Sequence, residues 1–404
     1  MRHRVGLLLL VVIVGALATA GLAMAFKPND DNWNFTWPQA RVKMPLAWNL
    51  TRGSRHVIIA VVDTGVNPKL PDFKGALVRG KDFVSGGYTK VDDDDHGTEL
   101  ASIIAARGNN HTEIPGYCWG CRVMPVRVAP YTSFNMGLAA AGIRWAADHG
   151  AQIIEISFSE FGDSPDPQVA SAIAYAAHKG VLVLASAGNT ASSGYTYPAA
   201  DPGAYAVAGT SRFDQISHWS TRGNWVHLAA AGCQLALNAH GVAIEPCGSS
   251  LSAPAVAGIA GLMLSVNPSL TPGQIVSILE RTAKPVAGIA GGRVNAYAAL
   301  LAAGASAALR AGEKPVRLSR FLGGRWKLGL AVQGKRVSAT LRSAKASSCS
   351  LSLASSGGVW LASRRGRSAD SLVARVAGGK YRLVVSCRLR RLRAASLTVR
   401  AFAH

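Results

Sequence analysis

The feature that most constrains the fold is an alternation of short apolar runs with amphipathic stretches, which continues from residue 57 to residue 304. Apolar, β-branched runs predict buried strands over residues 57–63, 121–128, 152–157 and 181–186. Apolar residues at helical spacing predict helices over residues 96–106, 136–149, 168–179, 250–264, 271–282 and 292–303. Because strands joined by helices run parallel, we expect an α/β fold with a parallel, doubly wound sheet covered on both faces. Functional groups should then lie at the carboxyl ends of the strands.

A change in charge and in texture near residue 305 predicts a domain boundary. Residues 26–304 hold 20 Lys and Arg and 20 Asp and Glu, whereas residues 305–404 hold 21 and two, a net charge of +19. Short alternating runs parted by Gly, Ser or charged turns also begin there. We therefore expect a linker over residues 305–320 and a small, basic, all-β domain of the sandwich type over residues 321–404.

The first 25 residues have the pattern of an export signal. Arg2 and Arg4 precede an apolar run over residues 6–22, and residues 23–25 (Ala-Met-Ala) fit a small-x-small cleavage site. We expect cleavage before Phe26 and a secreted, extracellular protein. The alternative is an uncleaved membrane anchor, because the apolar run approaches the length that spans a bilayer.

Six cysteines fall into three local groupings, which predict three disulfides in an exported chain. The expected pairs are Cys118–Cys121, Cys233–Cys247 and Cys349–Cys387. The first pair, in the motif CWGC, also permits a zinc half-site or a redox dithiol. A zinc site needs a second pair of ligands, which the neighbouring sequence does not offer, and a redox motif is expected to open a helix rather than a strand. A structural disulfide is therefore the favoured interpretation.

Three segments carry residues suited to acyl transfer: Asp63 in VVDTGV, His96 in DHGTELAS and Ser250 in GSSLSAP. Peptide hydrolysis needs a nucleophile, a base that takes its proton and a carboxylate that holds the base in one tautomer. The order Asp, His, Ser is one of three known orders for that arrangement. Each segment is weak alone, since DTG also occurs in aspartic proteases and a His before Gly-Thr is usually structural. Together they indicate a serine peptidase.

With these segments, residues 26–304 resemble the catalytic domain of the subtilase (subtilisin-like) family. Residues 26–30, 45–48 and 292–297 resemble its thermitase-like members. The resemblance implies the subtilisin type of α/β fold and a monomeric, secreted serine endopeptidase that acts on proteins or peptides and needs no cofactor for catalysis. The segment Ser186-Ala187-Gly188-Asn189 resembles the family's AAGN motif, which implies that Asn189 donates a hydrogen bond to the oxyanion. Without the other segments, Asn189 would be interpreted as a turn residue.

The resemblance also implies a structural calcium site, because thermitase-like members tie the N-terminus to two loops through Ca²⁺. The matching positions are the side chains of Asp30, Asp72, Asn110 and Thr112 and the carbonyls of Arg107 and Ile114. Hard oxygen donors of this kind suit Ca²⁺. The alternative is that the loop residues are ordinary turn residues.

Around the expected site the sequence departs from the family pattern. Ser157, Phe158, Ser159 and Glu160 align with Ser-Leu-Gly-Gly, the strand that pairs with bound peptide and, with Ser186, Ala187 and Gly188, forms the substrate-binding wall. Glu160 and the acidic residues 92–95 lead us to expect a preference for basic substrates, the alternative being solvated loop charges. Glu99 stands where the family often has a second His, and Asp95 where it has Gly. Three replacements surround the nucleophile: Ser249, Leu251 and Ser252.

The basic C-terminal region raises a second class of function, a binding protein in which the peptidase part is a passive support. Its positive charge would favour anionic cell-surface polymers or lipid headgroups. Nucleic acid is not expected, because aromatic residues are not interleaved with the basic runs and the chain is exported. The presence of Asp63, His96, Ser250 and Asn189 favours the enzyme. The signal pattern runs directly into the mature-like start, which leaves no room for the amino-terminal propeptide that blocks the cleft in the family. We therefore expect the arginine-rich residues 388–393 to control activity, either by lying near the acidic cleft or by being clipped off after export.

Overall fold

The computed structural model describes residues 25–304 except 89–91, 132 and 162–163, and beyond residue 305 it describes backbone strands only. The predicted export signal, apart from its last residue, lies outside the described residues. So do the side chains of the predicted basic domain, including those of residues 388–393 and of the pair Cys349–Cys387.

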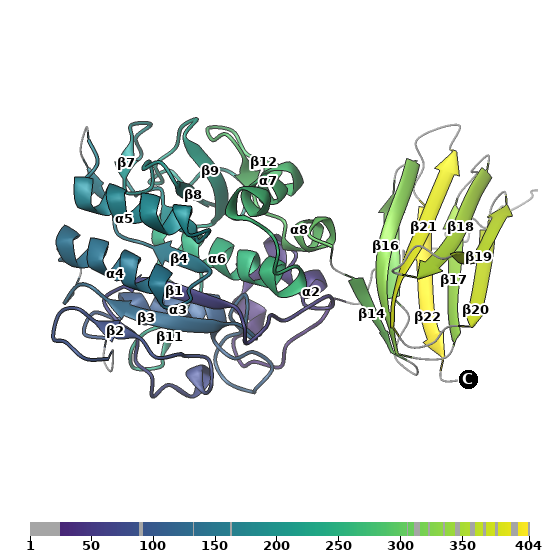
Figure 1. The fold of residues 1–404 in the computed structure, drawn as a ribbon, viewed down its shortest axis with the longest axis horizontal. Helices are drawn as coiled ribbons and strands as arrows, with labels where there is room; N and C mark the ends of the chain where they lie inside the picture. The colour runs from purple at the N-terminus through teal and green to yellow at the C-terminus, as the bar shows by residue number, and fades with distance from the viewer. Residues whose placement is uncertain are drawn as a thin grey trace, which may run out of the picture.

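The centre of the described chain is a nine-stranded sheet in the order β12-β13-β9-β8-β6-β4-β1-β3-β2 (Figure 1). Neighbouring strands are parallel except β12 and β13, which are antiparallel. The strands are β1 Ile58–Asp63, β2 Lys81–Asp82, β3 Arg122–Arg127, β4 Ile153–Ile156, β6 Leu182–Ser186, β8 Ala204–Thr210, β9 Val226–Ala231, β12 Lys284–Pro285 and β13 Gly292–Arg293. The chain passes from one side of β1, where β3 lies, to the other, where β4 lies. Such a switch point opens a crevice at the carboxyl ends of the strands.

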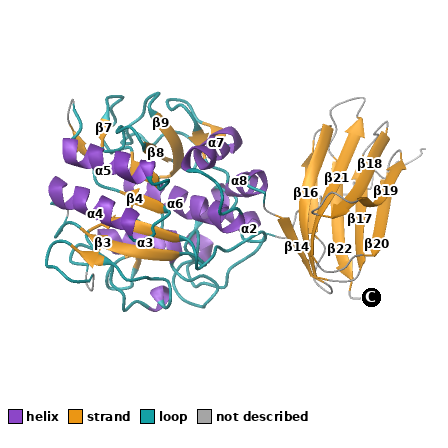
Figure 2. Ribbon diagram, viewed as in Figure 1, coloured by secondary structure: helices purple, strands orange, loops and turns teal. Residues whose placement is uncertain are grey.

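Helices cover both faces of this sheet, as Figure 2 shows. Alternate residues of β1 enter two separate cores: Ile59 and Val61 pack with α3 and α6, whereas Ala60 and Val62 pack with α4 and α5. The helices are α1 Trp37–Arg41, α2 Met44–Ala47, α3 His96–Ala105, α4 Met136–Asp148, α5 Pro167–His178, α6 Ser249–Val266, α7 Pro272–Thr282 and α8 Ala296–Ala302, with short 3₁₀ turns η1 Trp33–Phe35 and η2 Pro71–Phe73. The predicted α/β fold with a mainly parallel sheet is confirmed.

Helix α6 is, within the described part of the chain, the one helix long and apolar enough to cross a membrane. Most of it is buried inside the protein, where it packs against α3 and the sheet. Its apolar character is therefore that of a core helix.

Two element predictions need correction. The predicted helix over residues 292–303 begins only at Ala296, because Gly292 and Arg293 pair with β9 as β13 and Asn295 caps the helix through the N–H of Ala298 at 3.2 Å. The strands β8 and β9 were not predicted, although both are rich in Ala and Val. Two short antiparallel pairs complete this part: β5 Glu160–Phe161 with β7 Thr196–Tyr197, and β10 Ala236–Leu237 with β11 Ala243–Ile244.

Beyond residue 305 the backbone forms strands in two sheets, ordered β14-β16-β21-β18-β19 and β15-β22-β17-β20. Their bounds are β14 Ser306–Arg310, β15 Val316–Phe321, β16 Gly324–Gln333, β17 Arg336–Ser343, β18 Ser348–Ser355, β19 Trp360–Gly366, β20 Ala369–Arg375, β21 Gly379–Arg388 and β22 Ala395–Phe402. Strands β14 and β15 fall mostly within residues 305–320, where a linker was predicted. Cys349 and Cys387 are register partners on β18 and β21. A separate sandwich-like domain and the third disulfide stay predictions.

Candidate active site

Asp63 and His96 meet at the ends of two elements. Asp63 is the fully buried last residue of β1, and His96 is the first residue of α3. His96 Nδ1 lies 2.8 Å from Asp63 Oδ1, which also accepts a hydrogen bond from the N–H of Thr64 at 2.8 Å. Because Nδ1 is engaged with the carboxylate, Nε2 is the ring nitrogen left to accept a proton.

The charges around His96 favour its protonated form. Burial opposes the imidazolium, but the Asp63 carboxylate and its hydrogen bond, with smaller contributions from Glu99 and Glu155, outweigh burial and raise the pKa of His96 to about 9. The neutral imidazole, which is the form able to take a proton, therefore becomes abundant only in alkaline solution.

Ser250 and Asn189 face one space at the start of α6. Asn189 Oδ1 accepts hydrogen bonds from the N–H and the hydroxyl of Ser249, at 2.8 and 2.9 Å, so the orientation of the amide leaves its Nδ2 as a donor. A Cβ on Gly248 would lie 2.8 Å from Ser250 Oγ and 3.3 Å from Asn189 Nδ2. Glycine at residue 248 therefore keeps open the space that the hydroxyl and the amide donor share. Ser249 keeps a hydroxyl where the family has Thr, and it also accepts the N–H of Gly188 at 3.0 Å.

His96, Asn189 and Ser250 line one cavity of about 390 Å³. Its wall also contains Phe134 and Met136, which were not predicted, although Met136 opens a predicted helix. The rings of Phe134 and Phe158 stack with centroids 4.5 Å apart. The full lining is His96, Phe134, Met136, Ser157, Phe158, Ser159, Ser186, Asn189 and Ser250.

Three residues expected in the substrate-binding wall do not line the cavity through described side chains. Ala187 is buried in the core beneath α4 and α5, and Gly188 donates its N–H to Ser249 Oγ. Glu160 pairs with Tyr197 through the backbone of β5, and its side chain lies outside the described residues. Its predicted contact with substrate stays a prediction.

Three of the four acidic residues 92–95 have partners within the protein. Asp92 accepts the hydroxyl of Thr64 at 2.8 Å and the N–H of Thr98 at 2.7 Å. Asp93 forms an ion pair with the buried Arg127, and Asp95 accepts the N–H of Ala239 at 2.7 Å. These carboxylates hold the loop before α3, which weakens the argument that the run selects basic substrates.

Two further carboxyl groups, of Glu99 and Glu155, lie buried near His96. Burial raises the pKa of Glu99 to about 7, with neighbouring acids adding to the rise and His96 opposing it. Burial likewise raises the pKa of Glu155 to about 8. Glu99 was noted in the sequence as a departure, whereas Glu155 was missed. Its signal was a charged residue inside an otherwise apolar strand pattern, QIIEIS.

The four side chains expected to bind calcium lie together. Asp72 Oδ1 accepts hydrogen bonds from Thr112 Oγ1 at 2.6 Å and Asn110 Nδ2 at 3.1 Å. The carboxylate of Asp30 accepts the N–H of Asn109 at 2.8 Å. Both aspartates are buried, and burial, with the charge of Asp72 adding to it at Asp30, raises the pKa of each. Two buried carboxylates beside amide and hydroxyl oxygens fit a hard divalent cation, which would relieve their repulsion.

The structure pairs Cys118 with Cys121 and Cys233 with Cys247 as disulfides, as predicted. The second bridge lies directly before Gly248 and ties down the segment that leads into α6, the helix that carries Ser250. Because Cys118 and Cys121 are bonded to each other, their sulfurs are not free to bind zinc, and the zinc interpretation of CWGC is wrong.

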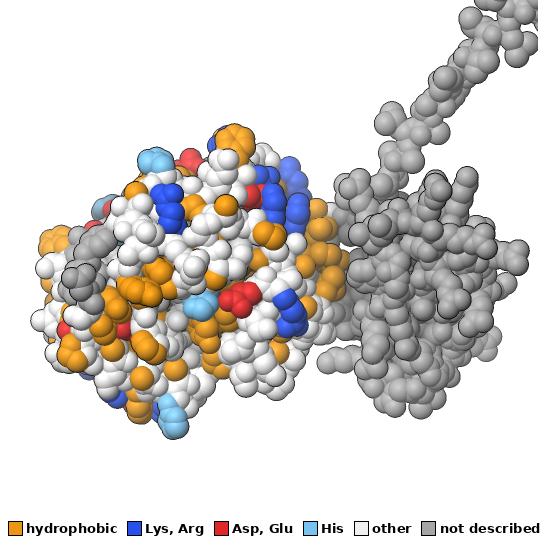
Figure 3. All heavy atoms as spheres, turned by 90° about the horizontal axis from the view of Figure 1, so that it is seen from above, with side chains coloured by type: hydrophobic (Ala, Val, Ile, Leu, Met, Phe, Trp, Pro, Cys, Tyr) orange, Lys and Arg blue, Asp and Glu red, His pale blue; other side chains and the backbone are white. Residues whose placement is uncertain are grey.

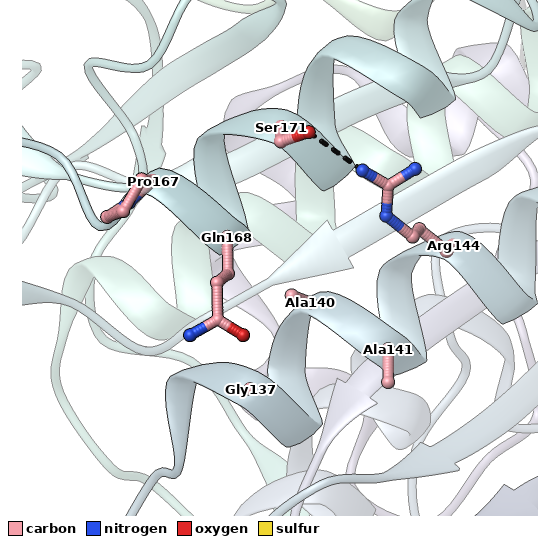
Figure 4. Close-up of a pocket in the computed structure, with 7 residues that line it drawn as sticks. All are labelled: Gly137, Ala140, Ala141, Arg144, Pro167, Gln168 and Ser171. Carbon is pink, nitrogen blue, oxygen red and sulfur yellow. Dashed lines mark hydrogen bonds between the residues drawn. The ribbon is translucent and has the colours of Figure 1, made fainter.

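A second hollow of about 470 Å³ lies between α4 and α5 (Figure 4). Arg144 Nη2 donates to Ser171 Oγ at 2.8 Å on its wall. It holds none of the expected site residues; its lining is Gly137, Ala140, Ala141, Arg144, Pro167, Gln168 and Ser171. On the face drawn in Figure 3, acidic, basic and apolar side chains are interspersed, in keeping with the balanced charge of residues 26–304.

Known proteins resemble the chain in sequence and in structure. The profile described as "Subtilase family" matches residues 54–312. The chain is 36% identical over 282 residues to thermitase of Thermoactinomyces vulgaris, a match that covers 68% of this chain and 99% of thermitase. It is 33% identical over 283 residues to a thermophilic serine proteinase of Bacillus sp. (strain AK1), covering 68% and 70%. A cell wall-associated protease of Bacillus subtilis (strain 168) is 32% identical over 288 residues, covering 67% and 32%. The solved structure of a protease from Pseudoalteromonas arctica PAMC 21717 superposes with a TM-score of 0.64 at 27% identity, covering 69% of this chain and 99% of that one.

Proposed function

This chain belongs to the subtilase family of serine-type endopeptidases, and from that premise we propose that it hydrolyses peptide bonds of proteins through Ser250, His96 and Asp63. Ser250 is the nucleophile, His96 the base that takes its proton, and Asp63 the carboxylate that orients the base. Asn189 donates a hydrogen bond to the oxyanion.

The observation that supports this proposal most is the 2.8 Å hydrogen bond between Asp63 and His96 beside a cavity that Ser250 and Asn189 also line. With Nδ1 bound to the carboxylate, Nε2 receives the proton of Ser250 as the hydroxyl attacks the carbonyl carbon of the substrate. The negative charge that develops on the carbonyl oxygen is met by Asn189 Nδ2. His96 then gives the proton to the leaving amine, and water hydrolyses the acyl-enzyme by the same steps in reverse.

A fluorophosphonate probe, which reacts covalently with activated serines, tests the assignment of the nucleophile. The wild type should be labelled and should digest a protein substrate, whereas Ser250→Ala should do neither. Ser265→Ala is the matched control, since this serine lies on the same helix and bonds the carbonyl of Gly261 at 2.7 Å, away from the cavity. Labelling that persists in Ser250→Ala would refute the assignment.

A Ca²⁺ ion held by Asp30, Asp72, Asn110 and Thr112, with the carbonyls of Arg107 and Ile114, forms part of the proposal. The support is the pair of buried carboxylates whose pKa values are raised by burial. The ion has no step in the reaction. It stabilises the junction of the N-terminal segment, η2 and the loop that follows α3.

Residues 1–25 act as a cleaved export signal, which makes the protein extracellular; residues 26–304 form the peptidase domain, and a basic β domain follows. The support is the signal pattern, the disulfides and the change in charge near residue 305. Sequencing the N-terminus of protein recovered from culture medium tests the cleavage, and a membrane-bound product that begins at Met1 would contradict it.

The basic C-terminal region supplies a second function, retention on anionic surfaces, supported by its net charge of +19. Full-length protein should bind an anionic resin and elute as salt screens the charges. Replacing the four arginines at residues 388, 390, 391 and 393 with glutamine should lower the salt needed for elution. Unchanged elution would refute a role for these arginines in retention, and increased peptidase activity of the same variant would support their autoinhibitory role.

A further inference from the structure

The helix that carries Ser250 begins with an unusual gap in its hydrogen bonds. In an α-helix the carbonyl of each residue accepts from the N–H four residues later. Pro254 lies four residues after Ser250 inside α6, and proline has no N–H. The carbonyl of Ser250 therefore needs a donor from outside the helix. Ser157 Oγ lies 3.1 Å from this carbonyl oxygen and can supply that donor.

The hydroxyl of Ser157 has a second partner, because its Oγ is also hydrogen bonded to Oε1 of Glu155. A serine hydroxyl carries one hydrogen. If Glu155 is ionised it can only accept, so Ser157 must give its hydrogen either to Glu155 or to Ser250. If Glu155 is protonated, it donates to Ser157 Oγ, and the hydrogen of Ser157 goes to the Ser250 carbonyl. Only the protonated carboxyl satisfies both contacts.

The surroundings of Glu155 favour the neutral form as well. Glu155 lies in β4 between β1 and β6, is fully buried, and its Oε2 has no hydrogen-bond partner among the described residues. Its strand neighbour Ile153 packs in the core beneath α3 and α6, so Glu155 lies on that face of the sheet.

The charged groups that act on Glu155 are Asp63 from β1 and His96 from α3, which also carries Glu99. Strand β6 and helix α6 contain no charged residue, and α4 covers the other face. Burial raises the pKa of Glu155 to about 8; the hydrogen bond of Ser157 opposes the rise, Asp63 adds to it, and His96 opposes it.

We propose that Glu155 is a positioning residue that works in its protonated form, donating to Ser157 so that Ser157 in turn holds the carbonyl of Ser250 at the first turn of α6. This inference rests on the proposed function, since it concerns the placement of its nucleophile. Ionisation of Glu155 in alkaline solution withdraws the hydrogen from the Ser250 carbonyl. Loss of this hydrogen bond slows the attack by Ser250.

The variant Glu155→Gln tests this, because the glutamine amide donates to Ser157 as the protonated carboxyl does but cannot ionise. The rate constant of fluorophosphonate labelling is measured for both proteins from about pH 6 to about pH 10. The two should agree within about threefold near pH 6, and the ratio of Glu155→Gln to wild type should rise as the pH passes through about 8. A ratio that stays flat over this range would overturn the proposal, as would a variant that is slow at pH 6.

Ser157→Ala provides the second arm. It removes the donor to the Ser250 carbonyl, which should lower kcat about tenfold below about pH 8, the usual cost of one unsatisfied buried acceptor, and by less above it, where the wild type has lost the same hydrogen bond. In this background Glu155→Gln should no longer change the pH dependence. A ratio that still rises through pH 8 without Ser157 would show that Glu155 does not act through the serine.

An infrared difference spectrum separates this inference from the proposed function, because it needs no activity. Wild type minus Glu155→Gln at pH 6 should contain the band of a protonated carboxyl group, and its absence would refute the inference even if the enzyme is active. Conversely, a wild type that the probe never labels would refute the proposed nucleophile while the band could still be present.

Discussion

The carboxylate of Asp214 forms ion pairs with three cationic side chains from distant parts of the chain. Its replacement by asparagine should lower the free energy of unfolding by an amount that the structure predicts. Asp214 accepts from Arg41 Nε at 3.0 Å, Lys284 Nζ at 2.6 Å and Arg293 Nε at 2.7 Å. Its backbone has φ of 61°, in the left-handed region that Asn tolerates as well as Asp. The variant Asp214→Asn therefore removes the charge without a change of shape or a cost in the backbone.

The exposure of the three partner side chains determines how much the replacement should lower the free energy of unfolding. The side chains of Arg41 and Lys284 are 38% and 56% exposed, so each pair contributes at most about 1 kcal/mol. Arg293 is only 7% exposed, and loss of its anion leaves a buried guanidinium without a countercharge, which typically costs about 3–5 kcal/mol. Because Arg293 keeps hydrogen bonds to the carbonyls of Arg41 and Val294, both at 3.0 Å, we expect the low end, about 3 kcal/mol.

Equilibrium unfolding in denaturant measures this difference, in a Ser250→Ala background so that the protein cannot digest itself. The matched control is Asp148→Asn, which removes an ion pair with Lys179 on the protein surface and should leave the free energy of unfolding unchanged. A loss below about 1 kcal/mol for Asp214→Asn would refute the reasoning, since it would mean that the buried guanidinium does not need its anion.

The pH dependence supplies an independent check. Burial acts to raise the pKa of Asp214, but its hydrogen bonds to Lys284 and Arg293 outweigh burial and hold the pKa below its usual value. A carboxyl group with a lowered pKa stabilises the fold fully above its unfolded value of about 3.9 and loses that contribution as the pH falls through the folded value. The gap between wild type and Asp214→Asn should therefore stay constant in neutral solution and close in strong acid.

Three further outcomes concern the site. Asn189→Ala should lower kcat about a hundredfold in steady-state kinetics, because it removes the proposed donor to the oxyanion, and a higher KM with unchanged kcat would contradict that role. A calcium chelator should lower the melting temperature of the wild type, while Asp72→Asn should melt lower from the start and not respond to the chelator; a wild type indifferent to the chelator would exclude the ion. Glu99→Gln should move the acidic limb of kcat/KM below the value of about 9 expected from His96, because it removes a negative charge that stabilises the imidazolium, and an unmoved limb would show that Glu99 does not act on His96.

The sequence predicted those parts of the fold in which a local residue pattern determines how the strands and helices are arranged. The apolar runs that end at Asp63 and at Ser186 are buried strands of one parallel sheet, because each is too short for a helix and leads into a turn. His96 and Ser250 lie within the first turns of helices, as their surroundings indicated. Since a parallel sheet brings its carboxyl ends to one edge, local patterns were enough to expect these residues together.

What could not be predicted depends on contacts between distant segments. The sequence around Asp214 does not indicate that Arg41 and Arg293 will form ion pairs with it. Likewise, nothing in the acidic residues 92–95 indicates that Arg127 forms an ion pair with one of them. Glu155 interrupts an apolar strand, but whether a buried carboxyl group is ionised depends on the hydroxyl and the carbonyl that the fold places beside it. Residue pattern predicts where a side chain lies, whereas its protonation state needs the neighbours.

The placement of Asp63 on the first long strand and of Ser250 on a late central helix has a consequence for the life of the enzyme. A chain emerging from synthesis carries Ser250 only after most strands of the sheet have been made, so it can bring Asp63, His96 and Ser250 together only late in its own folding. Loss of the same helix from the interior would dismantle the sheet and the reaction centre at once. The enzyme therefore becomes active only when its fold is complete, and it loses activity when the fold is lost.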